Sequence, residues 1–385
     1  MTNTANPENG SSVHWISIVG ARPQFVKLAP FCRAIEAHNE SGAAPRIAHK
    51  VIHTGQHYDP AIAGLFFQQM KIPEPDYNLA VGSGSHATQL ARMLERLEPV
   101  LLSEQADWVV VYGDTNSTLA GALVAARLHL PLAHVEAGCR SSDMRMPEEQ
   151  TRIVTDHLSR LLLAPSQSAV ANLHREGIAG EQDPRNRRAT MVGDIMFDAL
   201  LNSLPAAENK AIELLPRLGL ESRKYYLLTL HRAENTNSAE RLRQILDAVE
   251  SLDLPVLFPV HPRTKNVLEN AGIALNGNLR PVSPLGFFEM LAAEKHACKI
   301  LTDSGGVQKE AFYLGVPCVT LRDRTEWPET VELRANRIAG TDPARIREAI
   351  HSDWGETVTT SMPYGDGRAS QKIVNELLSE DGLYS

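Results

Sequence analysis

One segment, residues 302–310, has the residue types needed to bind a phosphate group. It reads Thr-Asp-Ser-Gly-Gly-Val-Gln-Lys-Glu, after a short apolar run at 297–301. This pattern predicts a strand that turns sharply into a helix. Ser304, Gly305 and Gly306 would then leave backbone N–H groups at the helix N-terminus, where the helix dipole favours an anion. Glu310, further along the helix, is placed to accept hydrogen bonds from the hydroxyls of a ribose.

A glycine-rich turn alone is weak evidence, because glycine is also common in tight turns and at helix ends. Here the turn stands between an apolar strand and a helix that carries a carboxylate. Gly315 is expected to end this helix, and a further strand is expected at 316–321. The combination predicts a site for a nucleoside diphosphate.

Other side chains that could do chemistry follow predicted strands elsewhere in the chain. In open α/β sheets, ligands bind beyond the carboxyl ends of the strands. Taken singly, these residues have simple structural explanations, such as a helix cap, a salt bridge or a hydrogen-bonded packing histidine. Their shared position is harder to explain in that way and predicts an active site. The residues are Arg22, Lys27, Asp114, Glu136, His231 and His261.

Strand-like and helix-like segments alternate along the chain, which predicts parallel sheets covered by helices. A length of 385 residues is too great for one ordinary core. We therefore expect an α/β protein with two Rossmann-like, doubly wound domains and a hinge near Gly193. Strands are expected at 14–19, 46–53, 108–112, 132–135, 161–164, 189–192, 225–230, 256–260, 297–301 and 316–321. Helices are expected at 117–127, 148–158, 239–251 and 286–295.

Composition argues against several partners. The net charge of −8 provides no general basic field, so neither nucleic acid nor an anionic membrane is expected to bind. The longest apolar stretch, residues 119–135, contains Arg127, His129 and Pro131 and is too polar to span a membrane. Residues 1–12 are polar and are expected to form a loose tail, not a signal peptide. The four cysteines are widely spaced, which indicates reduced thiols and a cytoplasmic protein.

Several motifs together resemble the non-hydrolysing UDP-N-acetylglucosamine 2-epimerases. The similarity runs from about Val13 to the C-terminus, and the motifs occur in the order found in that family. They include Gly-Ala-Arg-Pro-Gln-Phe-Val-Lys, Gly-Asp-Thr-Asn-Ser-Thr, His-Val-Glu-Ala-Gly and the diphosphate segment described above. Their positions are 20–27, 113–118, 134–138, 146–149, 230–234, 302–310 and 363–367.

The resemblance implies an overall organisation. We expect a disordered tail at 1–12, an N-terminal Rossmann-like domain at 13–192 and a UDP-binding Rossmann-like domain at 193–367. A helix within 368–385, at about 370–378, is expected to return to the first domain. This is the arrangement of glycosyltransferase-B proteins, with a UDP-sugar in the cleft between the domains. Family members commonly act as cytoplasmic homodimers in polysaccharide biosynthesis, and their chemistry requires neither a metal nor a redox cofactor.

The family reaction explains the residue types. The hydrogen on C2 of the sugar is not adjacent to a carbonyl, so the enzymes eliminate UDP with loss of that proton, forming 2-acetamidoglucal. They then add UDP back with a proton on the other face. The catalytic residues implied by the resemblance are Asp114, Glu136, Glu148 and His231, without an assignment of each carboxylate to one face. The residues implied to bind UDP or substrate are Arg22, Lys27, Phe287 (or its neighbour Phe288), Ser304, Gly305, Gly306, Glu310 and Arg232.

The chain departs from the usual family pattern at a few positions. Gln24 stands where glutamate is frequent, and Trp327 stands where arginine is frequent. Enzymes regulated by a second UDP-N-acetylglucosamine have Arg-Glu after a Gln-His pair, whereas Tyr-Asp follows Gln56-His57 here. A second, regulatory pocket formed by Gln56, His57 and His261 therefore stays a hypothesis.

Alternative functions remain at this stage. UDP-N-acetylglucosamine is the expected substrate, and UDP-2,3-diacetamido-2,3-dideoxyglucuronate is the alternative. Gln24, the run Gln308-Lys309-Glu310 and Trp327 resemble the branch that epimerises it. From other classes, a UDP-sugar glycosyltransferase, a hydrolysing relative and a non-catalytic UDP-sugar sensor share parts of the pattern. A glycosyltransferase shares the fold, but fold alone does not determine function. In a glycosyltransferase the carboxylates of Asp114, Glu136 and Glu148 would have no role.

Overall fold

The computed structural model describes residues 12–56, 67–354 and 362–381 of the chain. The chain divides into two compact units, Met1–Ala199 with Pro363–Ser385 and Leu200–Met362. The division falls inside helix α7 (Ile195–Arg217), whereas the sequence pattern placed it at Gly193. Apart from Ser12, the expected N-terminal tail lies outside the described residues, and so does His57.

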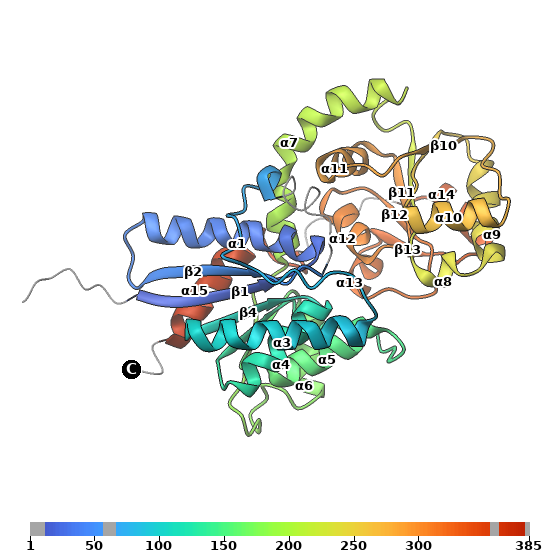
Figure 1. Cartoon of the computed structure of the whole chain (residues 1–385). Helices are drawn as coiled ribbons and strands as arrows, with labels where there is room; N and C mark the ends of the chain where they lie inside the picture. The colour runs from blue at the N-terminus through green and yellow to red at the C-terminus, as the bar shows by residue number, and fades with distance from the viewer. Residues whose placement is uncertain (1–11, 57–66, 355–361, 382–385) are drawn as a thin grey trace, which may run out of the picture. The chain divides into compact units, whose positions relative to one another are not determined.

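The first unit contains a parallel sheet of seven strands in the order β3-β2-β1-β4-β5-β6-β7. Figure 1 labels its strands β1, β2 and β4. Strand order reverses between β1 and β4, which makes the gap between their carboxyl ends a topological switch point. The strands are β1 (Ser12–Val19), β2 (Arg46–His53), β3 (Tyr77–Asn78), β4 (Trp108–Tyr112), β5 (Leu132–Val135), β6 (Leu161–Ala164) and β7 (Arg188–Met191).

Alternating side chains of β1 enter two different cores. Trp15 stacks on Phe31 of α1 (Arg22–Glu40), with 6.2 Å between the ring centroids. Ile16 and Ile18 belong to the core that packs under α3 (His86–Glu104) and α4 (Asn116–Arg127). Because strand side chains alternate between faces, helices cover both sides of this sheet. The unit also contains α5 (Pro147–Leu158) and α6 (Gln167–Arg175).

The second unit contains a parallel sheet of six strands in the order β10-β9-β8-β11-β12-β13. Its switch point lies between β8 and β11. The strands are β8 (Tyr226–Thr229), β9 (Val256–Pro259), β10 (Leu279–Val282), β11 (Lys299–Thr302), β12 (Cys318–Thr320) and β13 (Asn336–Ile338). The helices are α8 (Ala233–Thr236), α9 (Ala239–Glu250), α10 (Pro262–Asn270), α11 (Phe287–His296), α12 (Gly305–Tyr313), α13 (Pro328–Glu332) and α14 (Pro343–His351).

The C-terminal helix α15 (Ala369–Asp381) packs against α1 inside the first unit. Asp198 of α7 caps it by accepting hydrogen bonds from the backbone N–H groups of Ala369 and Ser370, at 3.0 and 2.8 Å. Near this cap, Gly193 has φ +92°, and a Cβ there would lie 2.8 Å from the carbonyl oxygen of Tyr364. The chain's return to the first unit therefore lies beside the segment through which it leaves.

The predicted α/β fold with two Rossmann-like units is confirmed, and the predicted strands recur within a few residues of their expected bounds. Helix α3 was not predicted. It is amphipathic, with Gln89, Met93, Leu97 and Leu101 buried at a spacing of one turn. That spacing was the signal in the sequence for this helix.

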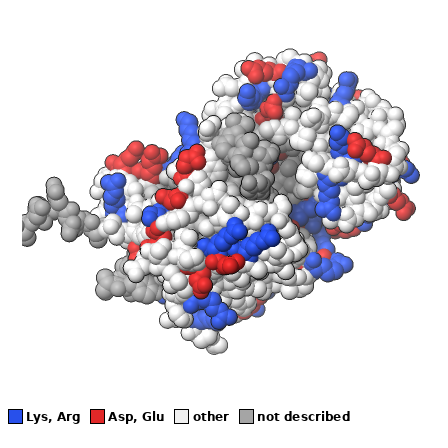
Figure 2. Space-filling model, viewed as in Figure 1, with Lys and Arg blue, Asp and Glu red and all other residues white. Residues whose placement is uncertain are grey.

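Charged side chains of both signs are mixed on the face drawn in Figure 2, so neither sign forms a continuous field there. Among the described residues, every helix is too short or too polar to cross a membrane.

Candidate active site

In the first unit, the residues after β1, β4 and β5 meet at the carboxyl edge of the sheet. Lys27, in the second turn of α1, is 6% exposed. Its Nζ lies 2.9 Å from Oε1 of Glu136, the residue after β5. Gly113, after β4, has φ +62°, and a Cβ there would lie 2.9 Å from Nζ of Lys27. The positive φ favours glycine at 113, and a larger residue there would have to displace the ammonium group of Lys27.

Glu136 adopts φ +73°, a left-handed conformation that costs free energy in a residue other than glycine. Its backbone N–H donates to the carbonyl of Leu163 at 3.0 Å, which holds the turn after β5 against β6. The surrounding structure thus imposes a backbone strain at a predicted catalytic residue.

Asp114 is held by Arg152 of α5, which the sequence pattern did not single out. Nε and Nη2 of Arg152 donate to Oδ2 of Asp114 at 3.0 and 2.6 Å, and Nη1 donates to Glu149 at 3.0 Å. Burial opposes the charged guanidinium, but the charges of Asp114 and Glu149 outweigh it and raise the pKa of Arg152. The sequence did contain a signal for this cluster. Glu149 and Arg152 are three positions apart on one helix, a spacing that brings opposite charges together.

Glu148 and Glu149 are neighbours in α5 with different surroundings. Glu149 is 1% exposed and accepts hydrogen bonds from the backbone N–H groups of Ser141 and Ser142, at 2.8 and 2.9 Å. Burial raises the pKa of Glu149, but these amides, the Ser141 hydroxyl and Arg152 more than compensate, so the pKa is lowered. Glu148, the predicted catalytic residue, is half-buried in the first turn of the helix.

The remaining predicted residues of the first unit are also placed. Arg22 is the exposed first residue of α1. Gln56 accepts hydrogen bonds from the backbone N–H and the hydroxyl of Ser117 at 3.1 and 2.7 Å, so its side-chain oxygen binds the start of α4. Gln24 donates from Nε2 to the carbonyl of Tyr112 at 3.1 Å, a contact that a glutamate carboxylate at this position does not make.

In the second unit, Asp303 lies within the 302–310 segment, but its side chain binds His231. Asp303 is fully buried. It accepts hydrogen bonds from the backbone N–H groups of His231 and Arg232, each at 3.0 Å, and its Oδ1 lies 3.1 Å from Nδ1 of His231. Burial raises the pKa of Asp303, but the hydrogen bond and charge of His231 and these amides lower it below its ordinary value.

The His231 ring also lies 5.7 Å from the ring of His261. His261 caps α10, and its Nδ1 accepts from the backbone N–H of Arg263 at 3.2 Å. Burial first, and then the charge of His231, lower the pKa of His261. A histidine that accepts through Nδ1 and has a lowered pKa is the neutral Nε2–H tautomer.

The predicted strand-to-helix turn at 302–310 is present. Ser304 is the N-cap of α12, and its side chain accepts from the backbone N–H of Val307. Gly305 is buried and Gly306 is exposed in the first turn, while Glu310 is half-buried further along the helix. The rings of Phe287 and Phe288, at the start of α11, form an edge-to-face pair with centroids 5.4 Å apart. Arg232 is the half-buried N-cap of α8.

Two unusual residues of this segment contact each other. Lys309 is 3% exposed, and its Nζ lies 3.9 Å from the centroid of the Trp327 ring, a cation–π contact. The nearby Arg322 forms salt bridges with two glutamates, Glu234 at 2.5 Å and Glu326 at 2.9 Å. Lys309 and Trp327, two of the residues that distinguish this chain, are therefore in direct contact.

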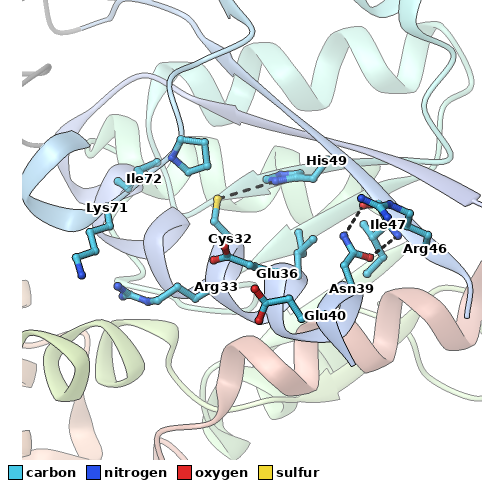
Figure 3. A pocket seen from close by; sticks show the side chains of 12 residues that line it. Cys32, Arg33, Glu36, Asn39, Glu40, Arg46, Ile47, His49, Lys71 and Ile72 are labelled. Carbon is cyan, nitrogen blue, oxygen red and sulfur yellow. Dashed lines mark hydrogen bonds between the residues drawn. The ribbon is translucent and has the colours of Figure 1, made fainter. Parts of the chain in front are cut away.

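A surface pocket of about 680 Å³ in the first unit lies apart from this chemistry (Figure 3). Among the described residues that line it, none is a predicted site residue. Cys32 points toward His49, with 3.9 Å between Sγ and Nδ1. Burial raises the pKa of Cys32 to about 12 and lowers that of His49 to about 4. Neither side chain is charged near neutral pH, so this pair does not supply a reactive thiolate.

Known proteins with similar sequences and structures identify the family. The model of the family described as UDP-N-acetylglucosamine 2-epimerase matches residues 39–378. A UDP-N-acetylglucosamine 2-epimerase homolog of Methanococcus maripaludis is 47% identical over 94% of this chain and 98% of its own length. The UDP-2,3-diacetamido-2,3-dideoxy-D-glucuronate 2-epimerase of Pseudomonas aeruginosa is 42% identical over 94% of this chain and 98% of its own length.

The crystal structure of the UDP-GlcNAc 2-epimerase of Methanocaldococcus jannaschii, in complex with UDP-GlcNAc and UDP, has a TM-score of 0.82. It is 40% identical and covers 96% of this chain and 100% of its own. Together with the match of the family model over most of the sequence, these similarities show that the chain belongs to the UDP-N-acetylglucosamine 2-epimerase family.

Proposed function

We propose that this protein interconverts UDP-N-acetylglucosamine and UDP-N-acetylmannosamine without hydrolysing them. The observation that carries the proposal is the placement of the predicted residues at the switch points of both sheets. Asp114 and the Lys27–Glu136 pair lie at the β1/β4 point and its neighbour β5, and the His231–Asp303 pair and Ser304 lie at the β8/β11 point. Relatives with 40–47% identity that carry the epimerase name support the same activity.

The proposed reaction balances without an oxidant. A base removes the proton from C2, the C1–O bond to UDP breaks, and the electron pair of the C–H bond forms the C1–C2 double bond of 2-acetamidoglucal. UDP then adds back to C1 while an acid delivers a proton to the opposite face of C2. Two faces need at least two groups that transfer protons, for which we propose Asp114, Glu136 and Glu148.

Departure of UDP requires positive groups for the diphosphate. We propose Arg22 and Lys27 from the first unit, and the N-terminus of α12 with Ser304, Gly305 and Gly306 from the second. His231 suits the leaving group, because Asp303 orients its ring through Nδ1. Glu310 is proposed to bind the ribose, with Phe287 and Arg232 completing the substrate site.

An acidic nucleotide sugar is the alternative substrate. The Pseudomonas aeruginosa relative, named for UDP-2,3-diacetamido-2,3-dideoxy-D-glucuronate, is 42% identical, as is the UDP-N-acetylglucosamine 2-epimerase of Methanocaldococcus jannaschii. The Lys309–Trp327 pair is the feature of this chain that favours the acidic sugar. Overall identity therefore does not separate the two substrates.

An NMR time course in heavy water tests the proposal. We expect UDP-N-acetylglucosamine to give an epimer with deuterium at C2 and no net release of UDP. Free N-acetylmannosamine with UDP would instead indicate a hydrolysing enzyme. Binding without turnover would indicate a sensor, and transfer of the sugar to an added acceptor a glycosyltransferase. Turnover of the diacetamido-glucuronate alone, with no reaction of UDP-N-acetylglucosamine, would reassign the substrate.

We further propose a cytoplasmic homodimer. Light scattering measures the mass of the assembly, for which the chain mass is 42.3 kDa. A second nucleotide site at Gln56, His57 and His261 is tested by whether excess UDP-N-acetylglucosamine accelerates the reverse reaction.

A further inference from the structure

His134, in β5, joins three segments that carry proposed catalytic carboxylates. Its side chain is fully buried. Nε2 lies 2.8 Å from the carbonyl oxygen of Gly113, the residue before Asp114. Nδ1 lies 2.6 Å from Oδ1 of Asp156, on the helix α5 that carries Glu148. His134 itself stands two positions before Glu136 on the same strand and turn.

The hydrogen-bond partners determine where the protons of this ring lie. A backbone carbonyl is only an acceptor, so Nε2 of His134 must donate to Gly113. Asp156 accepts on its other oxygen, Oδ2, from Nη1 of Arg140 at 2.7 Å and from the backbone N–H of Gly138 at 3.1 Å. Burial raises the pKa of Asp156, but His134 and Arg140 outweigh it and lower that pKa. Arg140 is always charged, and its ion pair with Oδ2 together with the N–H of Gly138 makes Asp156 a carboxylate, so Nδ1 of His134 must donate as well.

The resulting buried charges compensate each other. The His134 imidazolium faces the Asp156 carboxylate, which also binds Arg140. Arg140 also forms a bidentate salt bridge with Glu176. Its Nε donates to Oε1 at 2.7 Å, and its Nη2 donates to Oε2 at 2.8 Å. Two positive and two negative groups thus alternate from the interior to the partly exposed Glu176, so the imidazolium is paired and hydrogen-bonded as a buried charge requires.

We propose that His134 is a positioning residue for the epimerase reaction, acting as a buried imidazolium that fixes Asp114 and α5 relative to Glu136. One ring spans the end of β4 and helix α5, while Gly138, at the end of the turn that begins with Glu136, binds the same Asp156. The proposal goes beyond the assignment of the carboxylates but rests on the proposed function for its kinetic test.

Nitrogen NMR of the unmodified protein tests the protonation state directly. In protein labelled at histidine nitrogens, the His134 ring should show two slowly exchanging N–H groups at the pH of the activity assay. The His134→Asn variant assigns the signals by their loss. If His134→Asn does not fold, His134→Gln assigns the same signals. A single ring proton on His134 would overturn the proposal. This outcome does not depend on the substrate of the enzyme.

Two variants separate the partners of the ring. In His134→Gln the amide nitrogen reaches about as far as Nε2 and keeps the bond to Gly113. In His134→Asn it reaches only about as far as Nδ1 and keeps the bond to Asp156. We expect kcat to fall about 10- to 100-fold in the Asn variant and clearly less in the Gln variant. UDP affinity should change less than about 3-fold in both, because the diphosphate is bound elsewhere.

The matched control is His38→Gln. The Nε2 of His38 also lies within hydrogen-bond distance of a backbone carbonyl, that of Pro45 at 2.9 Å. His38 is in the last turn of α1, whereas the proposed site residues Arg22 and Lys27 are in its first two turns. Its kcat should equal that of the unmodified enzyme. Equal kcat values for the Asn and Gln variants, or a loss of UDP binding in step with kcat, would contradict a positioning role. If the unmodified protein turns over neither nucleotide sugar, the proposed function fails while the NMR result still decides the protonation state.

Discussion

Nδ1 of His231 lies 3.1 Å from Oδ1 of Asp303, a fully buried carboxylate that follows a different strand of the same sheet. The two residues are 72 positions apart in the chain and meet because β8 and β11 are neighbours at the switch point. Asp303 also binds the backbone N–H groups of His231 and Arg232, so it fixes both the ring and the turn that carries it.

We predict that Asp303→Asn lowers kcat by about 100-fold or more, because an amide does not hold the His231 ring in the same tautomer and orientation. UDP affinity should fall much less. Asp253→Asn is the matched control, since Asp253 accepts a hydrogen bond from Tyr226 at the other end of β8. Steady-state kinetics and UDP titration measure both effects. An Asp303→Asn enzyme with normal kcat would remove His231–Asp303 from the mechanism.

The same variant gives a prediction for stability against pH. The folded-state pKa of Asp303 is lowered, so its ionised form stabilises the fold above the unfolded-state pKa of about 3.9. This contribution is lost as pH falls through the lower folded-state pKa. The unfolding free energy of wild type should therefore exceed that of Asp303→Asn at pH 6, and the difference should shrink below about pH 4. A difference that stays constant down to pH 2.5 would contradict the lowered pKa.

Asp114→Asn, Glu136→Gln and Glu148→Gln should each lower turnover by orders of magnitude, with a smaller change in UDP affinity. Asp114→Asn should also destabilise the protein, because the buried Arg152 then loses one of its two carboxylates. Deuterium incorporation at C2 and thermal unfolding measure the two effects separately. Near-normal turnover in all three variants would show that the carboxylates are wrongly assigned.

Gly113→Ala should displace Lys27 as well as strain the backbone. A Cβ at 113 lies 2.9 Å from Nζ of Lys27, at φ +62°. We expect a loss of about 1–3 kcal/mol in unfolding free energy and weaker UDP binding. Gly219→Ala is the matched control: its φ is +63°, but nothing lies within 4 Å of the added Cβ, so only the backbone cost applies. Equal effects of the two changes on UDP binding would contradict the role of Lys27.

Trp327→Arg should destabilise the second unit, because it places a guanidinium against the buried ammonium of Lys309 in place of an aromatic ring. The additional change Lys309→Glu should restore stability by creating an opposite-charge pair. Trp327→Phe keeps an aromatic face and is the control. Thermal unfolding of wild type, Trp327→Arg, Lys309→Glu and the double variant forms a double-mutant cycle. Additive effects of the two changes would show that the residues are not coupled.

The predicted strands and the strand-to-helix turn at 302–310 could be recognised from the sequence, and the roles of the predicted site residues stay a prediction. Their signals are local: an apolar run predicts a buried strand, and a polar or glycine residue at its end predicts a turn. The positions of Ser304 as the N-cap and of Glu310 within α12 follow from spacing in a single helix. A local signal of this kind survives in the sequence because neighbouring residues alone produce it.

The partners of those residues were decided by tertiary structure. Arg152 binds Asp114 from 38 positions away, and His134 binds Asp156 from 22 positions away. Asp303 was predicted as part of the phosphate segment, but in the structure its side chain binds His231. Lys309 and Trp327 were recognised separately as unusual, but only the fold places one over the other. The physical reason is that strand order, set by packing of the whole sheet, determines which carboxyl ends are neighbours. The sequence by itself therefore determined which groups are available for chemistry, and the tertiary structure determined which of them share a proton or a charge.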